Sequence, residues 1–119
     1  GDITKAYEEA GLQIRAMKMM QMTDRIARIH YAEHLEKPFY GELAAFMTSA
    51  PLVAMVLAGE NAIARVRELH GATNPVNAAE GTIRKRFAKN GSENAVHASD
   101  SPESAAREVH IFFSETEIF

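Results

Sequence analysis

The sequence predicts a single α+β domain in which helices and strands are mixed. Apolar residues recur at helical spacing over residues 3–10 and again over residues 101–113. Between these helices, residues 12–22 and 51–59 carry the apolar patterns typical of strands. A chain of 119 residues is long enough to bury a core without a metal or a disulfide, so we expect one domain over residues 1–119.

The first half of the chain predicts a helix, a strand and two more helices. The first helix ends at Gly11, a residue type common just after a helix. The strand over 12–22 is rich in methionine, which we interpret as core packing, because thioethers alone rarely bind a metal. Thr23 is a good N-cap for a helix that should end before Pro38, and residues 40–48 predict a short helix.

The second half predicts a strand, a helix, a long irregular segment and a last helix. Residues 51–59 are apolar on both faces, which indicates a central strand. A helix follows over 61–70. Residues 71–93 lack periodicity apart from a possible helical turn at 82–88, and irregular segments of this length are usually functional. The last helix should begin at Ser101, which precedes a proline.

Composition and charge exclude several classes of protein. The chain has no cysteine, so it forms no disulfide and no thiolate metal site. Its net charge of −3 argues against a broad nucleic-acid-binding surface but allows a small basic pocket. The N-terminus lacks the pattern of a signal peptide, and the longest apolar run is too short to span a bilayer. We therefore expect a cytoplasmic protein with no membrane partner and no specific nucleic-acid partner.

A histidine near the last helix is the first candidate catalytic residue. Ala95 and Val96 predict the end of a buried strand, and Ser101 begins a helix. His97 would then lie at a strand-to-helix junction, held rigidly while still facing a cleft. A lone histidine beside apolar residues is more often structural than catalytic, so this octet alone leaves both interpretations open.

Two arginines and a threonine favour the catalytic interpretation. If the irregular segment folds back toward His97, then Arg67, Arg84 and the hydroxyl of Thr73 converge on a nucleophilic imidazole. Such a set suits phosphoryl transfer. Other cations in this region are more consistent with a solvated surface: Lys85, Arg86 and Lys89.

Six short motifs make the chain resemble the bacterial nucleoside diphosphate kinases. They occur in the family's order and cover nearly all of the chain. The set is highly specific, because no other known family joins these turns at these separations. The motifs are His30 to His34, Lys37 to Tyr40, Met47 to Pro51, Gly71 to Pro75, Glu80 to Arg84 and Asn94 to Ser101. The resemblance implies a ferredoxin-like fold, a four-stranded antiparallel sheet covered by helices.

The resemblance also implies an activity and a set of site residues. His97 would take the γ-phosphoryl group from a nucleoside triphosphate and give it to a nucleoside diphosphate. A neutral imidazole is nucleophilic near pH 7, and a phosphoramidate is labile enough to pass the group on. By the same resemblance, Arg67, Thr73 and Arg84 hold the phosphates together with Mg²⁺, and the protein supplies no metal ligand of its own. Asn94 matches a sugar contact, Phe39 and Leu43 match a clamp on the base, and Tyr31, Ser99 and Glu108 match residues that orient His97 or the phosphate.

Two departures from the family pattern leave other functions open. Ala98 stands where many relatives have glycine, so a positive φ there would be strained. The family usually begins with a strand and a Lys-Pro-Asp segment, whereas this chain opens near the first helix, so we expect the sequence to be incomplete at its N-terminus. The alternatives are a truncated, catalytically weak relative that acts as a nucleotide-binding or oligomeric module, and a regulatory domain that binds a small anion.

Assembly is the last expectation. Relatives form oligomers, so the resemblance implies a tetramer or a hexamer. The exposed edge of the methionine-rich strand and the apolar C-terminal pair Ile118 and Phe119 would supply surface to bury on a neighbour.

Overall fold

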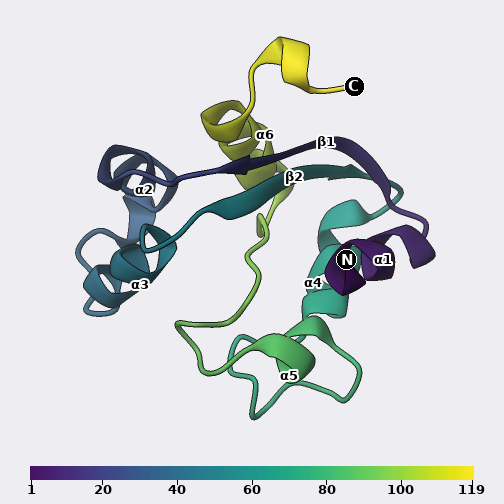
Figure 1. Cartoon of the computed structure of the whole chain (residues 1–119), viewed down its shortest axis with the longest axis horizontal. Helices are drawn as coiled ribbons and strands as arrows, with labels where there is room; N and C mark the ends of the chain where they lie inside the picture. The colour runs from purple at the N-terminus through teal and green to yellow at the C-terminus, as the bar shows by residue number, and fades with distance from the viewer.

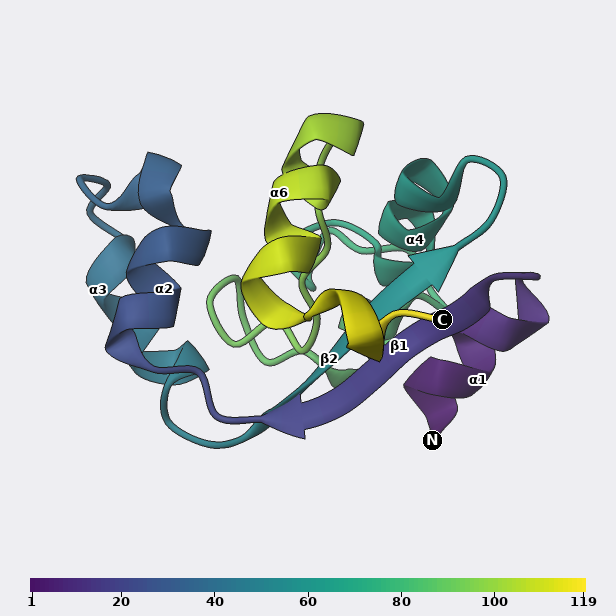
Figure 2. The same ribbon diagram turned by 90° about the horizontal axis from the view of Figure 1, so that it is seen from above.

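The computed structural model describes residues 1–119 and confirms the α+β class. A two-stranded antiparallel sheet crosses the molecule, and helices gather at its two ends and over one face (Figures 1 and 2). The elements in chain order are α1 (Asp2–Glu9), β1 (Gln13–Met20), α2 (Asp24–His30), the 3₁₀ helix η1 (Ala32–His34), α3 (Tyr40–Met47), β2 (Leu52–Ala58), α4 (Ala62–His70), α5 (Ile83–Phe87), α6 (Pro102–Phe112) and the 3₁₀ helix η2 (Glu115–Glu117).

Local capping explains most of the helix boundaries. The hydroxyl of Thr23 accepts a hydrogen bond from the Ile26 N–H at 3.2 Å, and that of Ser101 accepts from the Ser104 N–H at 3.1 Å. One predicted end is wrong: α2 stops at His30, well before Pro38. The backbone leaves the helix at Tyr31, whose ring is buried in the core, and continues into η1.

The sheet is smaller than expected. β1 pairs with β2 in an antiparallel register that places Met17 opposite Met55 and Met19 opposite Val53. The prediction that residues 51–59 form a central strand is wrong. A central strand needs a hydrogen-bonding neighbour on each side, and β2 has only β1; Val53 is accordingly 43% exposed.

The segment before His97 is not a strand. No other segment pairs with it, and the Val96 N–H instead donates to the Asn94 carbonyl at 2.8 Å, which folds the backbone into a tight turn. Ala95 between them has φ +71°, whereas Ala98 is not among the residues with positive φ. The predicted strain therefore falls on Ala95 and not on Ala98.

Two apolar clusters lie toward opposite ends of the sheet. One joins α1, α4 and α5 through Tyr7, Leu12, Val66 and Ile83. The other joins α2 and α3 to the end of β1 through Met22, Ala27, Tyr31 and Leu43. Helix α6 stands between these groups in Figure 2. The chain between α5 and α6, which includes His97, crosses the same space in Figure 1.

The C-terminal residues lie along the free edge of β1. The Phe119 N–H donates to the Arg15 carbonyl at 2.7 Å, and Lys18 forms an ion pair with Glu117 at 3.1 Å. The Phe119 side chain is still 80% exposed. None of the helices combines the length and the apolar content needed to cross a membrane.

Candidate active site

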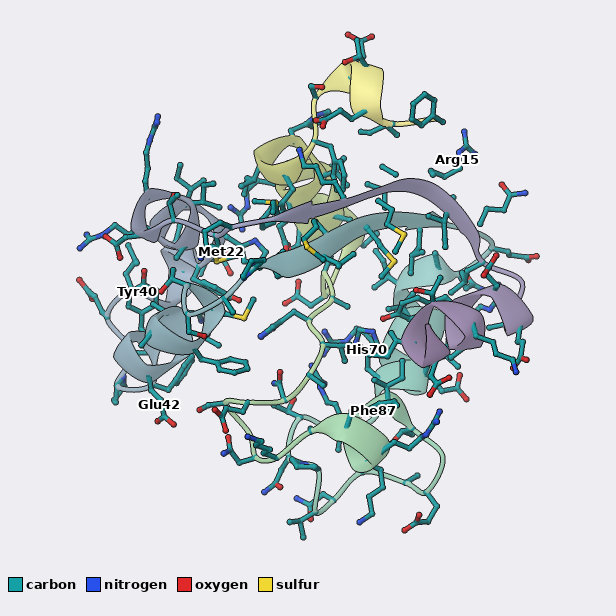
Figure 3. All side chains as sticks on the ribbon, viewed as in Figure 1. Arg15, Met22, Tyr40, Glu42, His70 and Phe87 are labelled. Carbon is teal, nitrogen blue, oxygen red and sulfur yellow. The ribbon has the colours of Figure 1, made fainter.

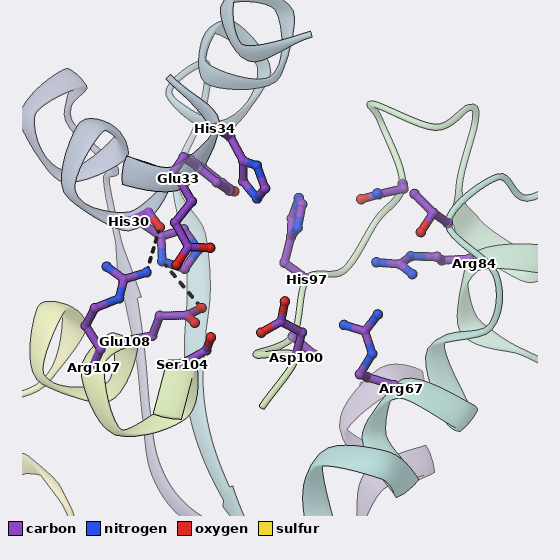
Figure 4. A pocket seen from close by; sticks show the side chains of 14 residues that line it. His30, Glu33, His34, Arg67, Arg84, His97, Asp100, Ser104, Arg107 and Glu108 are labelled. Atoms are coloured by element: carbon purple, nitrogen blue, oxygen red, sulfur yellow. Dashed lines mark hydrogen bonds and ion pairs between the residues drawn. The ribbon is translucent and has the colours of Figure 1, made fainter. Parts of the chain in front are cut away.

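A cavity of about 210 Å³ lies between the two helical groups (Figure 4). It is lined almost entirely by polar and charged side chains from α2, η1, the end of α4, the irregular segment and α6. The structure brings most of the predicted site residues to this cavity: Tyr31, Arg67, Thr73, Arg84, Asn94, His97 and Glu108.

His97 stands in the cavity as a neutral imidazole. Its ring packs edge-on against the Tyr31 ring, with 5.9 Å between centroids. His97 is exposed to solvent, and the cavity walls surround part of its ring. Desolvation by these walls, together with the positive charge of Arg84, lowers the pKa of His97 to about 4. At pH 7 the ring therefore carries a free lone pair and can act as a nucleophile.

Arg84 ties two parts of the site together. Its Nη1 donates to the Gly71 carbonyl at 3.1 Å, and its Nη2 donates to the Val96 carbonyl at 2.9 Å. Only 9% of Arg84 is exposed, which is unusual for an arginine. Ile83, the first residue of α5, is buried in the first cluster and draws Arg84 inward with it. The guanidinium thus fixes the 71–75 turn relative to the His97 segment.

Arg67 and Asp100 line the same cavity near each other (Figure 4). Figure 4 shows the guanidinium groups of Arg67 and Arg84 directed toward the space beside His97. Arg67 is exposed and free to move, unlike Arg84. Hydrogen bonding by Ser104 is the main cause that lowers the pKa of Asp100, with a further contribution from the charge of Arg67. The cavity therefore offers both a cationic wall and an ionised carboxylate.

Glu108 lies on α6 beside a second histidine. Its Oε1 is 3.6 Å from Nδ1 of His30. Burial raises the pKa of Glu108, while the Arg107 charge and the Ser99 hydroxyl lower it. Ser99 is therefore close to the Glu108 carboxylate although it does not line the cavity. Arg107 donates to the carbonyls of Ile29 and His30, which holds α6 against α2.

Asn94 presents an unpaired acceptor. It is 3% exposed, its Nδ2 donates to the Gly91 carbonyl at 3.1 Å, and its Oδ1 has no partner. A buried carbonyl oxygen without a hydrogen bond is costly, so a residue that lines a cavity in this state is suited to accept one from a ligand.

Phe39 and Leu43 do not line the cavity. Leu43 is 8% exposed and packs in the second cluster, whereas Phe39 is 46% exposed and lies beside His34, with 5.7 Å between ring centroids. The two residues are one helical turn apart, and the Leu43 N–H donates to the Phe39 carbonyl at 3.0 Å.

Sequence reasoning did not assign several residues that line the cavity: His30, His34, Asp100 and Arg107. Helical spacing was no signal for His30 and His34, because α2 ends at His30 and His34 belongs to η1. Asp100 was not assigned because it stands between Ser99 and Ser101, where the sequence pattern indicates helix capping.

Comparison with known proteins identifies the family. The family model described as nucleoside diphosphate kinase matches residues 1–118. The chain is 59% identical over 118 residues to a nucleoside diphosphate kinase of Paracoccus denitrificans, which covers 99% of this chain and 84% of the relative. It is 52% identical over 118 residues to that of Methanobrevibacter smithii, covering 99% of this chain and 79% of the relative.

Solved structures agree. The Aquifex aeolicus nucleoside diphosphate kinase superposes with a TM-score of 0.97 at 46% identity, covering 100% of this chain and 86% of that chain. The Halobacterium salinarum enzyme, solved in complex with CDP, gives a TM-score of 0.95 at 38% identity, covering 100% of this chain and 80% of that chain. These matches support the ferredoxin-like fold predicted from the sequence. The chain belongs to the nucleoside diphosphate kinase family, whose members are phosphotransferases acting on nucleotides.

Proposed function

We propose that His97 is the residue phosphorylated during transfer of the γ-phosphoryl group between nucleotides. The observation that carries this proposal is the convergence of His97, Arg67 and Arg84 on one polar cavity. A ring nitrogen of His97 attacks the γ-phosphorus, an N–P bond forms, and the bond to the β-phosphate oxygen breaks. The nucleoside diphosphate leaves, and a second one takes the group by the reverse step.

Arg67, Thr73 and Arg84 are proposed to hold the phosphates. Arg84 is oriented by its two backbone partners, so its charge is in place before the nucleotide arrives. Arg67 is exposed and can follow the phosphates as they move. Positive charge from two sides compensates the charge on the phosphoryl oxygens during transfer.

Asn94 and Phe39 are proposed to contact the nucleoside. The unpaired Oδ1 of Asn94 suits a sugar hydroxyl, and the exposed Phe39 ring offers a stacking surface for any base. Leu43 supports this surface from the core, one helical turn away. The CDP complex of the Halobacterium salinarum relative is consistent with nucleotide binding at such a site.

Tyr31, Ser99 and Glu108 are proposed to orient His97 and the transferring group. Tyr31 packs against the His97 ring, and Ser99 stands near the Glu108 carboxylate, which lines the same cavity. These contacts limit the rotation of the imidazole, so that the nucleophilic nitrogen keeps its direction.

The residues present fit a divalent cation that is held mainly by the nucleotide. No group of three or more histidine or acidic side chains could hold a metal ion on its own. Mg²⁺ typically binds through one or two carboxylates, water and substrate phosphates, and Asp100 offers such a carboxylate in the cavity. The family uses a divalent cation, and we propose Mg²⁺ with Asp100 on the protein side. When bound, it would neutralise phosphate charge.

We also propose a cytoplasmic homo-oligomer. Exposed apolar side chains on one face of the sheet support assembly: Met17, Met19 and Val53. A tetramer or a hexamer would bury such a face.

The test is phosphorylation by a γ-labelled nucleoside triphosphate with Mg²⁺. Wild-type protein should gain an acid-labile label on one histidine, and His97→Ala should gain none. His110→Ala is the matched control, because His110 is an exposed residue of α6 that does not line the cavity, and it should label normally. Label retained in the His97→Ala protein would overturn the assignment.

A further inference from the structure

A buried polar pair lies directly behind the proposed site. His70, the last residue of α4, is 1% exposed, and its Nε2 is 2.6 Å from the Tyr7 hydroxyl on α1. Figure 3 shows His70 inside the molecule beside α4. Tyr7 packs in the first cluster with Leu12, Val66 and Ile83, and its hydroxyl joins His70 to this cluster. Burying two polar groups there costs free energy unless they bond to each other, so each residue depends on the other.

The pair is connected to the reacting histidine by a short path. His70 precedes Gly71, whose carbonyl accepts from Arg84. Arg84 also donates to the carbonyl of Val96, the residue before His97. A shift of the His70 ring therefore displaces the Gly71 carbonyl, and with it the guanidinium that orients the nucleophile segment.

The space at this junction is too tight to absorb such a shift. Gly71 has φ +85°, and a Cβ added there would lie 2.6 Å from Oγ1 of Thr82. Thr82 caps α5, the helix that carries Arg84. Movement of the 70–71 peptide would thus press on the same helix whose second residue is Arg84.

The electrostatics favour a neutral pair. Burial, and then the charges of Arg84, His97 and Arg67, lower the pKa of His70 to about 4, and burial raises the pKa of Tyr7 to about 12. The charged groups that act on the pair are the two arginines and His97, and no carboxylate is among the causes that shift either pKa, so a positive charge on His70 would be uncompensated. A neutral His70 keeps its bond to the Tyr7 hydroxyl and adds no charge behind the arginines.

We propose that Tyr7 and His70 are positioning residues, which hold the Gly71 carbonyl and thereby Arg84 in the arrangement that phosphoryl transfer needs. The proposal rests on the roles assigned above to Arg84 and His97. Neither residue of the pair touches the nucleotide.

The experiment compares phosphohistidine formation in single turnover for four proteins: wild type, Tyr7→Phe, the double variant Tyr7→Phe with His70→Met, and Leu12→Ala. Tyr7→Phe keeps the ring but leaves a buried histidine nitrogen without a partner. A misplacement of about 1 Å can lower a rate by roughly 10²-fold, so we expect a partial shift to lower the rate constant by about tenfold. The double variant removes both polar groups and should recover to within about twofold of wild type.

Leu12→Ala is the control for a purely structural role. Leu12 is 3% exposed in the same cluster, and its side chain cannot form hydrogen bonds. Its backbone N–H donates to the Tyr7 carbonyl at 3.1 Å, a bond that alanine keeps. It should lower the urea midpoint while the rate constant of the folded protein stays unchanged. Loss of rate in Leu12→Ala equal to that in Tyr7→Phe would overturn the proposal, because a general loss of stability would then explain both.

A wild-type rate in Tyr7→Phe would also overturn it. If Tyr7→Phe did not fold, His70→Gln would take its place, since glutamine keeps a hydrogen-bonding group with a different reach, and a wild-type rate there would refute the proposal equally. Failure of the proposed function is distinguishable, because it would show as wild-type protein that forms no phosphohistidine.

Discussion

Substituting Arg84 by alanine should unfold the protein more easily as well as slow catalysis. Arg84 is buried and donates to two backbone carbonyls, at 3.1 and 2.9 Å. A hydrogen bond from a charged donor contributes about 1.5 to 3 kcal/mol. Because the cavity admits water that can partly solvate both carbonyls, we take the lower value for each and expect a loss of about 3 kcal/mol in the free energy of unfolding.

Arg67→Ala is the matched control. Arg67 lines the same cavity and carries the same charge, but it is exposed, and the hydrogen bond it forms is through its backbone carbonyl, which alanine keeps. Its removal should leave the free energy of unfolding within about 0.5 kcal/mol of wild type. Both variants should lose one contact to phosphate and with it about 1.5 to 3 kcal/mol of transition-state binding, measured as kcat/KM.

Urea unfolding followed by circular dichroism separates the two variants. The structure predicts an intact fold of wild-type stability for Arg67→Ala only. Equal urea midpoints for Arg84→Ala and wild type would refute the bridging role of the guanidinium. Wild-type kcat/KM in both variants would place the phosphate-binding pocket elsewhere.

Two further predictions concern pH and backbone geometry. The pKa of His70 is lowered to about 4 from an ordinary value of 6.5. Between these two pH values the unfolded chain binds a proton on His70 more readily than the folded chain does. The free energy of unfolding should therefore be greatest above pH 6.5 and fall by about 3 kcal/mol between pH 6.5 and 4. Urea midpoints measured across this range should fall less steeply in the Tyr7→Phe, His70→Met double variant, and identical slopes would contradict the assignment. Gly71→Ala forces a Cβ against Thr82 at positive φ and should cost about 2 kcal/mol or more, whereas Gly41→Ala, which meets no atom within 4 Å, should be neutral or stabilising in the same thermal melt.

Features set by neighbouring residues were predictable from the sequence. The helix starts at Thr23 and Ser101 depend on a hydroxyl three residues from the N–H that it accepts, so the local pattern contains the whole interaction. The convergence of Arg67, Thr73 and Arg84 near His97 was also predictable, but only because the family motifs carry that information.

Features set by distant neighbours were not predictable. Val96 follows a pattern typical of a strand, yet it forms none, because a strand exists only where another segment pairs with it. Tyr7 and His70 are 63 positions apart, and neither position alone indicates a partner. Arginines are mostly exposed in proteins, yet Arg84 is buried beside Ile83, which packs in the first cluster.

The burial of Arg84 has a physical advantage for phosphoryl transfer. A free arginine must lose side-chain freedom when it meets a phosphate, whereas Arg84 has already been fixed by two carbonyls during folding. The same two bonds attach it to the segment that carries the nucleophile, so the cation and the imidazole cannot shift independently. The exposed Arg67 lacks this constraint and can adapt as phosphates enter and leave. Arg84 thus defines the geometry of the reaction, and Arg67 accommodates the exchange of nucleotides. Substitutions at the two positions should therefore differ in their effect on the free energy of unfolding but agree in their effect on phosphate binding.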